Sequence, residues 1–114
     1  MKAQGNPHAG ACDVPQDIID RIVDVLGPAD IWLFGSRARG DHRPDSDWDF
    51  LVVLPDHAPA ESLDMVQAWG RLRDLRLRRV EVYPVRRAEF EEGRTCRGTL
   101  SQIVAVEGRL VHAA

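Results

Sequence analysis

Residues 34–40 read Phe-Gly-Ser-Arg-Ala-Arg-Gly, and residues 46–52 read Ser-Asp-Trp-Asp-Phe-Leu-Val. The first stretch completes the apolar run Ile31–Phe34, which is typical of a buried strand because it is short, continuous and ended by a glycine. The second stretch begins another apolar run, Trp48–Leu54, which is closed by a proline. We therefore expect two strands joined by a turn-rich segment, residues 35–45.

Hydrophobic periodicity predicts helices and further strands around this pair. The expected elements are helices over 15–26, 60–75 and 99–106, strands over 80–85 and 110–111, and an irregular or partly helical segment over 86–97. Pro84 indicates that the strand at 80–85 lies at a sheet edge or ends there. In the helix at 60–75 the side chains expected to face inward are Leu63, Val66, Trp69, Leu72 and Leu75. This order indicates an α+β or mixed α/β domain, with a small mixed β-sheet flanked by helices.

Length and composition limit the organisation of the chain. Its 114 residues, 44% apolar and 29% charged, predict one globular domain at 15–114, preceded by a flexible tail at 1–14 that is rich in Gly, Ala, Pro and His. No apolar run is long enough for a membrane span or a secretory signal. We therefore expect a cytoplasmic protein whose two cysteines, Cys12 and Cys96, are free thiols.

Charge is unevenly distributed along the sequence. Residues 1–57 contain ten Asp and five basic residues, whereas residues 58–114 contain ten Arg and eight acids, which gives −5 and +2 and a total of −3. An acidic balance argues against extensive wrapping of nucleic acid. It is compatible with a local acidic cluster that binds metal and a local basic surface that meets an anionic partner.

The Gly35-Ser36 pair has the chemistry of an anion-binding turn. It follows a strand directly and opens a short helical turn, so that backbone N–H groups and a hydroxyl are available to a phosphate. Glycine has no Cβ and permits close approach of a ligand. Taken alone, the pair is equally typical of an ordinary turn, because it lacks the lysine of a P-loop.

Asp47 and Asp49 are two residues apart on a predicted strand, which places both carboxylates on the same face. Two neighbouring carboxylates repel each other unless a cation holds them, and Mg²⁺ prefers a few carboxylates together with substrate phosphates. The alternative is a solvent-facing pair at the start of the strand.

Together the two motifs resemble the nucleotidyltransferase superfamily of the DNA polymerase beta type. The family pattern is Gly-Ser-x-Ala-x-Gly, followed after a spacer by Ser-Asp-x-Asp, two apolar residues and Val. This sequence matches it at Gly35, Ser36, Ala38, Gly40, Ser46, Asp47, Asp49 and Val52. The short chain and the segment 103–111 resemble the smallest members, the minimal nucleotidyltransferases (MNT). The resemblance covers residues 17–112.

The resemblance implies a polymerase beta-like fold and a two-metal transfer of a nucleotide. Gly35 and Ser36 would hold the phosphates of a nucleoside triphosphate, most plausibly ATP, and Asp47 and Asp49 would bind two Mg²⁺ ions. The family's third carboxylate corresponds to Glu81, which would complete the metal site and help to deprotonate the acceptor hydroxyl. Glu in place of the usual Asp departs from the family pattern, because the extra methylene moves the carboxylate by about 1.5 Å and a displacement of that order can cost about 10²-fold in rate.

Arginines accompany these motifs. Arg37 and Arg39 flank the Gly-Ser turn, and we expect at least one of them to reach a phosphate, the alternative being a solvated turn residue. A second group, Arg71, Arg73, Arg76, Arg78 and Arg79, surrounds the end of a predicted helix. Positive side chains stabilise the C-terminal end of a helix, so part of this group would have that role. The other part would form a basic surface for an acidic protein or RNA. A solvated face is the simpler interpretation.

The resemblance also suggests a partner. In the MNT subfamily the acceptor is commonly a tyrosine of a HEPN-type ribonuclease toxin, and the MNT protein is the antitoxin. A small chain leaves little material for a separate substrate pocket, which favours an acceptor carried by another protein. The alternative is a catalytically weak or inactive nucleotide-binding module that neutralises its partner by stoichiometric contact. The sequence leaves open whether the protein forms a homo- or hetero-oligomer. Direct DNA binding is not expected, because strand-gripping domains are absent from the sequence.

Overall fold

The computed structural model describes residues 14–114. Its elements are α1 Gln16–Leu26, β1 Asp30–Phe34, α2 Ser36–Arg39, β2 Trp48–Leu54, α3 Ala60–Leu63, α4 Met65–Arg71, α5 Arg73–Arg76, β3 Val80–Arg86, α6 Arg87–Gly93, α7 Leu100–Glu107 and β4 Arg109–His112. The predicted strands are therefore confirmed, as is the α+β class with a mixed sheet. The predicted tail, apart from Val14, and Cys12 lie outside the described residues, whereas Cys96 is an exposed free thiol.

The sheet has the strand order β3-β2-β1-β4. Strand β1 is antiparallel to both β2 and β4, whereas β2 and β3 run parallel. Residues 55–79, which contain α3, α4 and α5, form the crossover that parallel neighbours require. The predicted edge position of the strand around Pro84 is confirmed, because β3 ends the sheet.

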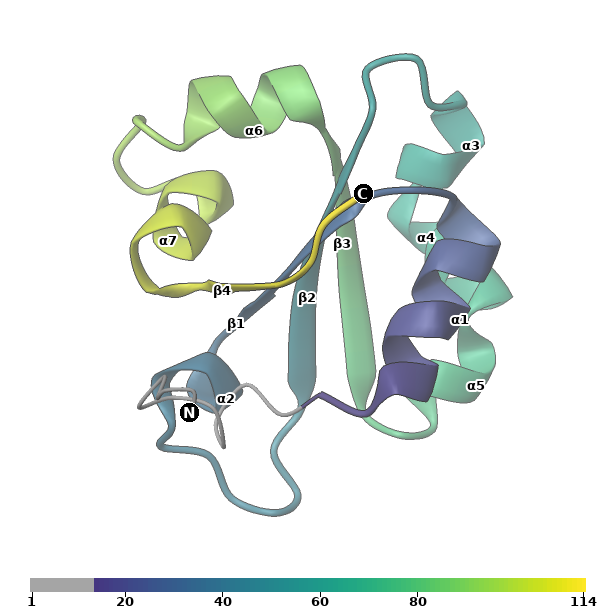
Figure 1. Ribbon diagram of the computed structural model, residues 1–114, viewed down its shortest axis with the longest axis vertical. Coiled ribbons are helices and arrows are strands. Elements are labelled where there is room, and N and C mark those ends of the chain that lie inside the picture. Colours follow the sequence, from purple (N-terminus) through teal and green to yellow (C-terminus); the bar gives the residue numbers. More distant parts are fainter. Residues whose placement is uncertain (1–13) are drawn as a thin grey trace.

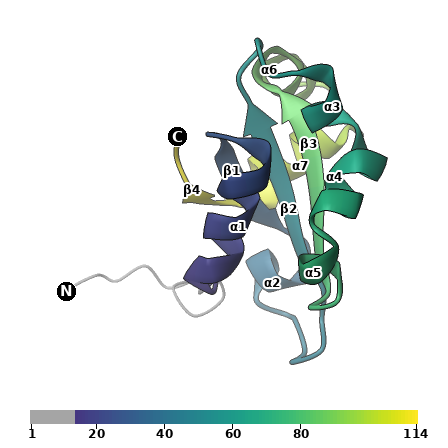
Figure 2. The same cartoon turned by 90° about the vertical axis from the view of Figure 1, so that its right-hand side faces the viewer.

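Helices cover both faces of the sheet (Figures 1 and 2). The larger core lies between the sheet and helices α1, α4 and α5, with Ile22, Leu33, Phe50 and Leu75 fully buried in it. The smaller core lies under α6 and α7 on the opposite face and contains the residues Leu51, Val53, Phe90 and Val104. The alternating side chains of β1 and β3 thus serve two cores, whereas β2, which is central, is buried on both sides from Phe50 to Leu54.

The prediction of one continuous helix over 60–75 is wrong, because the segment is divided into α3, α4 and α5. The first break is at Asp64, whose carboxylate accepts hydrogen bonds from the backbone N–H groups of Val66 and Gln67 and so begins a new helix. The second is at Leu72, where the backbone leaves helical geometry. The predicted inward position of Val66 is also wrong, since it is 78% exposed, while Leu72 and Leu75 are buried as expected.

Gly108, which ends α7 as predicted, is packed against backbone. A Cβ at this position would lie 2.5 Å from the carbonyl oxygen of Val104 and 3.2 Å from that of Leu33. Because backbone atoms cannot move aside cheaply, we expect Gly108→Ala to lower the free energy of unfolding by about 1–3 kcal/mol, measured by urea denaturation. Gly70→Ala is the matched control: no atom lies within 4 Å of its Cβ position, and alanine favours a helix, so this variant should be neutral or slightly stabilised. Equal effects of the two changes would contradict the prediction.

Candidate functional site

The Gly-Ser turn lies where β1 passes into α2. Gly35 has φ +80° and ψ −160°, a backbone conformation that favours glycine, and its carbonyl oxygen accepts hydrogen bonds from the backbone of Ala38 and Arg39. Ser36 begins the single helical turn that follows. The predicted short helical turn after the strand is therefore confirmed, with Gly35 at its cap.

Gly35 is in direct contact with the Asp49 carboxylate. A Cβ built on Gly35 would lie only 2.8 Å from Asp49 Oδ2, which is closer than real Cβ contacts. The two residues meet because β1 and β2 are antiparallel neighbours in which Phe34 is paired with Asp49. The absence of a side chain at Gly35 thus allows the turn and the carboxylate to share one small space.

Glu81 lies beside Asp49 on the next strand. The parallel register of β2 and β3 pairs the two residues, so both carboxylates project from the same face of the sheet. Burial, followed by the negative charges of Glu81 and Asp47, raises the pKa of Asp49 from 3.8 to about 6. The three predicted acidic residues therefore act on one another electrostatically, and the arrangement is one that a cation would stabilise.

Asp47, just before β2, forms an exposed ion pair with Arg79. Asp47 Oδ1 lies 3.6 Å from Arg79 Nη1, and the Arg79 carbonyl oxygen accepts a 2.8 Å hydrogen bond from the Trp48 backbone. Arg79 has a φ of 62°, which is unusual for a residue with a side chain. No sequence signal predicts this conformation, and the backbone hydrogen bond of Arg79 joins the starts of β2 and β3.

Within residues 14–114, no three His, Cys, Asp or Glu side chains converge closely enough to enclose a metal ion as they stand. The chemistry of the donors nevertheless fits Mg²⁺, which takes hard oxygen ligands and retains positions for water and phosphate. The pKa of Asp49 is raised first by burial and then by Glu81 and Asp47, so a cation would stabilise the charged carboxylate, and Gly35 has no side chain that would displace it. Asp47, Asp49 and Glu81 are accordingly the residues that would hold the ion.

Tyr83 is a site residue that the motif analysis did not assign. Its hydroxyl donates a 3.1 Å hydrogen bond to Glu81 Oε1, and burial together with Glu81 raises the pKa of Tyr83 to about 12, so it remains a donor at neutral pH. Strand alternation places Tyr83 on the face of Glu81, which was the available signal. The ring is fixed by Phe34 and Trp69, whose centroids lie 5.7 and 6.3 Å away.

We expect Tyr83→Phe to lower kcat for nucleotidyl transfer about tenfold with little change in the KM for ATP, because a freed Glu81 carboxylate samples unproductive positions. Steady-state kinetics would separate the two constants. Val85→Ala, a truncation farther along the same face of β3, controls for general loosening of the smaller core. A purely structural role for Tyr83 would instead lower thermal stability without a selective effect on kcat.

Arg37 has a different role from the predicted phosphate contact. Its side chain is buried, with Nε and Nη2 donating 3.0 Å hydrogen bonds to the carbonyl oxygens of Ser46 and Pro44. The guanidinium also stacks on the Trp48 ring, 4.0 Å from its centroid. Arg37 therefore fastens the loop that leads to Asp47 to the turn that begins at Gly35.

We expect Arg37→Lys to destabilise the protein by about 2–3 kcal/mol, because an ammonium group can neither satisfy both carbonyl groups nor stack on the ring in the same way. Thermal denaturation would measure the effect. Arg43→Lys, an exposed change in the same loop, is the matched control and should have almost no effect. Comparable stability of the two variants would show that the loop does not depend on Arg37.

Arg39, the other predicted phosphate ligand, is exposed and forms ion pairs with Asp41 and Glu107, both at 3.2 Å. Exposed pairs of this kind are weak and exchangeable, so they leave the side chain able to turn toward an anion. A phosphate contact by Arg39 therefore stays a prediction. Among the predicted residues, the structure brings together Gly35, Asp49 and Glu81, with Asp47 and Ser36 alongside.

Comparison with known proteins decides the family. A family model described as a nucleotidyltransferase domain matches residues 16–111. The chain belongs to the nucleotidyltransferase domain family. This membership agrees with the resemblance found in the two motifs and with the polymerase beta-like arrangement of the sheet. No curated protein matches this nucleotidyltransferase domain.

Two solved structures share the fold of this nucleotidyltransferase domain. One, a toxin–antitoxin with AMP-PNP, is 22% identical with a TM-score of 0.61, covering 89% of this chain and 75% of that one. The other, a mutant of the toxin–antitoxin MntA-HpeT, is 23% identical with a TM-score of 0.59, covering 87% and 73%. In residues 14–114 there is no helix of the length and apolarity needed to cross a membrane.

Proposed function

We propose that this nucleotidyltransferase domain transfers AMP from ATP to a hydroxyl group, most plausibly of a tyrosine, on a partner protein such as a HEPN-type toxin, and thereby acts as an antitoxin. The observation that carries the proposal is the meeting of Gly35, Asp49 and Glu81 at one end of the sheet. The similar folds described as toxin–antitoxin structures, one of them with AMP-PNP, support the choice of partner and nucleotide.

Each residue has a place in this mechanism. The backbone of Gly35 and Ser36 would bind the phosphates of ATP, next to the carboxylates of Asp47, Asp49 and Glu81, which would hold Mg²⁺. The bound ions would neutralise the phosphate charge and lower the pKa of the acceptor hydroxyl. In the transfer, the acceptor oxygen forms a bond to the α-phosphorus, the bond to pyrophosphate breaks, and a Glu81 carboxylate oxygen takes the hydroxyl proton. Catalysis of this kind depends on positioning and electrostatics, so few residues are needed.

Labelling of the partner tests the proposal. The protein is incubated with α-labelled ATP, Mg²⁺ and the folded product of a neighbouring gene, and the label should appear on that product. The double variant Asp47→Asn with Asp49→Asn should show no transfer, whereas Asp45→Asn, an exposed carboxylate of the same loop, should retain it. Absence of label on a verified, folded partner would contradict the proposal.

A second function is favoured by two observations. The three carboxylates do not enclose a metal ion as they stand, and Glu81 replaces the usual Asp. A nucleotide-binding module that neutralises its partner by stoichiometric contact would need no transfer. This alternative is supported if the Asp47→Asn, Asp49→Asn variant still neutralises the partner fully. It is excluded if catalytic amounts of the wild-type protein are sufficient.

A further inference from the structure

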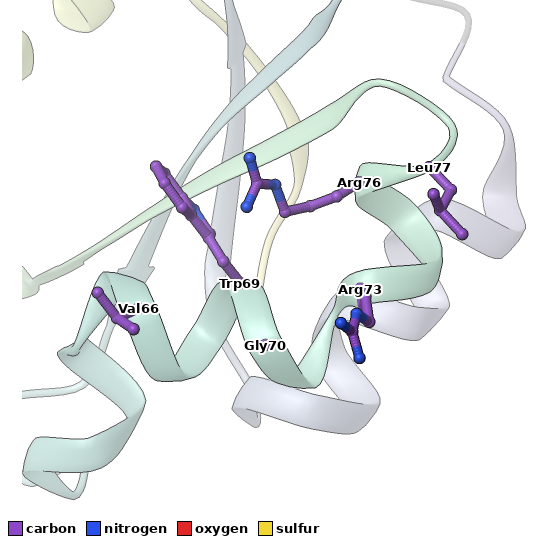
Figure 3. A pocket seen from close by; sticks show the side chains of 6 residues that line it. All are labelled: Val66, Trp69, Gly70, Arg73, Arg76 and Leu77. Carbon is purple, nitrogen blue, oxygen red and sulfur yellow. The ribbon is translucent and has the colours of Figure 1, made fainter.

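A surface groove lies along α4 and α5 beside the free edge of the sheet (Figure 3). Its volume is about 650 Å³, and it is lined by Val66, Trp69, Gly70, Arg73, Arg76 and Leu77. The groove exists because the segment expected as one straight helix bends at Leu72, between α4 and α5. The bend lets Trp69 and Arg76 face the same space.

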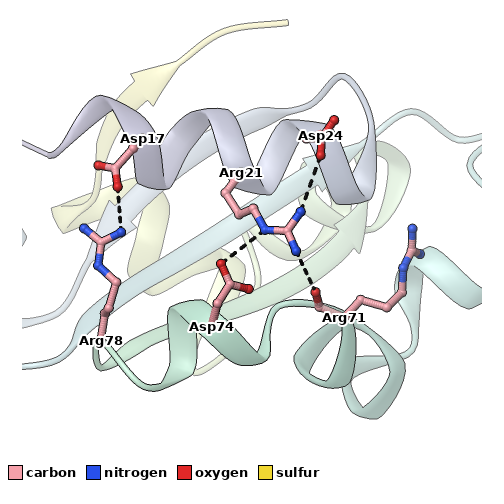
Figure 4. Close-up of polar contacts among 6 residues, drawn as sticks. All are labelled: Asp17, Arg21, Asp24, Arg71, Asp74 and Arg78. Atoms are coloured by element: carbon pink, nitrogen blue, oxygen red, sulfur yellow. Dashed lines mark hydrogen bonds and ion pairs between the residues drawn. The ribbon is translucent and has the colours of Figure 1, made fainter.

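The groove carries positive charge that no carboxylate within residues 14–114 neutralises. The other arginines in this region are engaged: Arg78 pairs with Asp17, Arg21 with Asp24 and Asp74, and Arg71 donates to the carbonyl oxygen of Val25 (partly shown in Figure 4). Arg73 and Arg76, in contrast, are exposed and have no carboxylate within ion-pair distance among residues 14–114. These two side chains therefore remain available to an external anion.

Apolar side chains border this charge. Val66 is 78% exposed and Leu77 is 85% exposed, the two highest values among the large apolar residues described. Trp69 forms the floor of the groove, with the Arg76 guanidinium 4.6 Å from its ring centroid. Exposed apolar side chains beside unpaired arginines are typical of protein interaction surfaces, in which aromatic residues and arginine are enriched.

The groove is also connected to the candidate site. Trp69 donates a 2.8 Å hydrogen bond to the carbonyl oxygen of Val82 on the free edge of β3 and packs edge-on against Tyr83. Tyr83 in turn donates to Glu81, the carboxylate expected to take the acceptor proton. A molecule bound in the groove would therefore be separated from Glu81 by the side chains of Trp69 and Tyr83.

We propose that this groove binds an acidic segment with apolar side chains on the partner protein that carries the acceptor hydroxyl. The identity of the partner rests on the proposed function, and the chemistry of the segment rests on charge complementarity. Carboxylates of the segment pair with Arg73 and Arg76, and its apolar side chains contact Val66 and Leu77. Nucleic acid is disfavoured because a base stacks on an open aromatic face, whereas the Arg76 guanidinium lies over one face of the Trp69 ring.

Binding without nucleotide or Mg²⁺ tests this surface separately from catalysis. The ¹⁵N-labelled protein is titrated with a peptide that alternates Glu and Leu, with a peptide in which Lys replaces Glu, and with single-stranded oligothymidine. The indole N–H signals of the three tryptophans are followed by NMR and assigned by Trp→Phe replacements. We expect a saturable shift of the Trp69 signal with the Glu-Leu peptide and smaller changes at Trp32 and Trp48.

The double variant Arg73→Glu with Arg76→Glu should weaken binding of the Glu-Leu peptide about tenfold or more. Arg94→Glu with Arg97→Glu, the same change of charge on the side of the sheet that carries α6 and α7, is the control and should leave binding nearly unchanged. No saturable shift up to about 1 mM peptide, equal loss in both double variants, or tighter binding of the oligonucleotide would overturn the proposal. Since no transfer is measured, an inactive enzyme would not affect these outcomes.

Discussion

Asp49→Asn is expected to lower nucleotidyl transfer by about 10³-fold or more and, in metal-free buffer at neutral pH, to stabilise the fold. The loss of activity follows because amide oxygen is a poor substitute for a carboxylate ligand, and metal-ion stabilisation of the transition state is worth several kcal/mol. The gain in stability has a separate cause. Wild-type Asp49 is charged at pH 7 although burial, Glu81 and Asp47 all oppose that charge.

The pH dependence of stability follows from the same pKa. Asp49 has a pKa of about 6 in the folded protein against 3.8 for the free side chain, so the folded state binds more protons between these values. The wild-type protein therefore loses stability as the pH rises through this window, and Asp49→Asn does not. The free energy of unfolding of the variant should equal that of the wild type below pH 4 and exceed it by about 1–2 kcal/mol at pH 7. This difference allows for solvent screening of a half-buried carboxylate.

Urea denaturation at several pH values, with a chelator and then with Mg²⁺, would measure both effects. Mg²⁺ should stabilise the wild type by binding to its folded state and should stabilise the variant much less. Asp45→Asn is the control, because its carboxylate is exposed in the preceding loop. Stability curves of wild type and Asp49→Asn that run parallel from pH 4 to 7 would contradict the electrostatic account of the site.

The parts of this site that local sequence determines could be predicted. Strands end where apolar runs end, so the apolar runs predict β1 and β2 correctly, and side-chain alternation predicts Asp47 and Asp49 on one face. Alternation along residues 80–85 likewise puts Glu81 and Tyr83 on a common face. In each case the information lies within a few residues of the side chain concerned.

The features that the sequence did not reveal depend on contacts between distant segments. The pairing of Asp49 with Glu81 needs the parallel register of β2 and β3, which a crossover of 25 residues separates, residues 55–79. Arg79 adopts its unusual backbone conformation to join those strands. Arg37, expected at a phosphate, is instead held by loop carbonyl groups that only the folded chain brings within reach.

The division of the helix at 60–75 shows a third limit, competition between local signals. Periodicity favoured one helix, but the Asp64 side chain supplies an alternative set of hydrogen bonds that begins a new one. The same division exposes Val66 and shapes the groove. The prediction of one continuous helix therefore did not reveal this surface.

Gly35→Ala is expected to lower kcat/KM for ATP by about 10²-fold or more. The new methyl group would lie 2.8 Å from Asp49 Oδ2, so either the carboxylate or the turn must shift, and displacements near 1 Å can cost this much. The backbone at φ +80° adds strain of about 1–3 kcal/mol for any residue with a side chain. Activity and stability should therefore both fall.

Gly27→Ala separates these two causes. Gly27 has a comparable φ of +96°, but no atom lies within 4 Å of its Cβ position. We expect both variants to lose stability through backbone strain, Gly35→Ala to lose about 1 kcal/mol more because of the Asp49 contact, and only Gly35→Ala to lose activity. The contact itself is measured by a double-mutant cycle in which Gly35→Ala is introduced beside Asp49→Ala, where the destabilisation should shrink by about 1 kcal/mol because the opposing carboxylate is gone. An unchanged destabilisation in that background would mean that backbone strain alone explains the need for glycine at position 35. It would contradict the direct contact between Gly35 and the Asp49 carboxylate on which the site is argued.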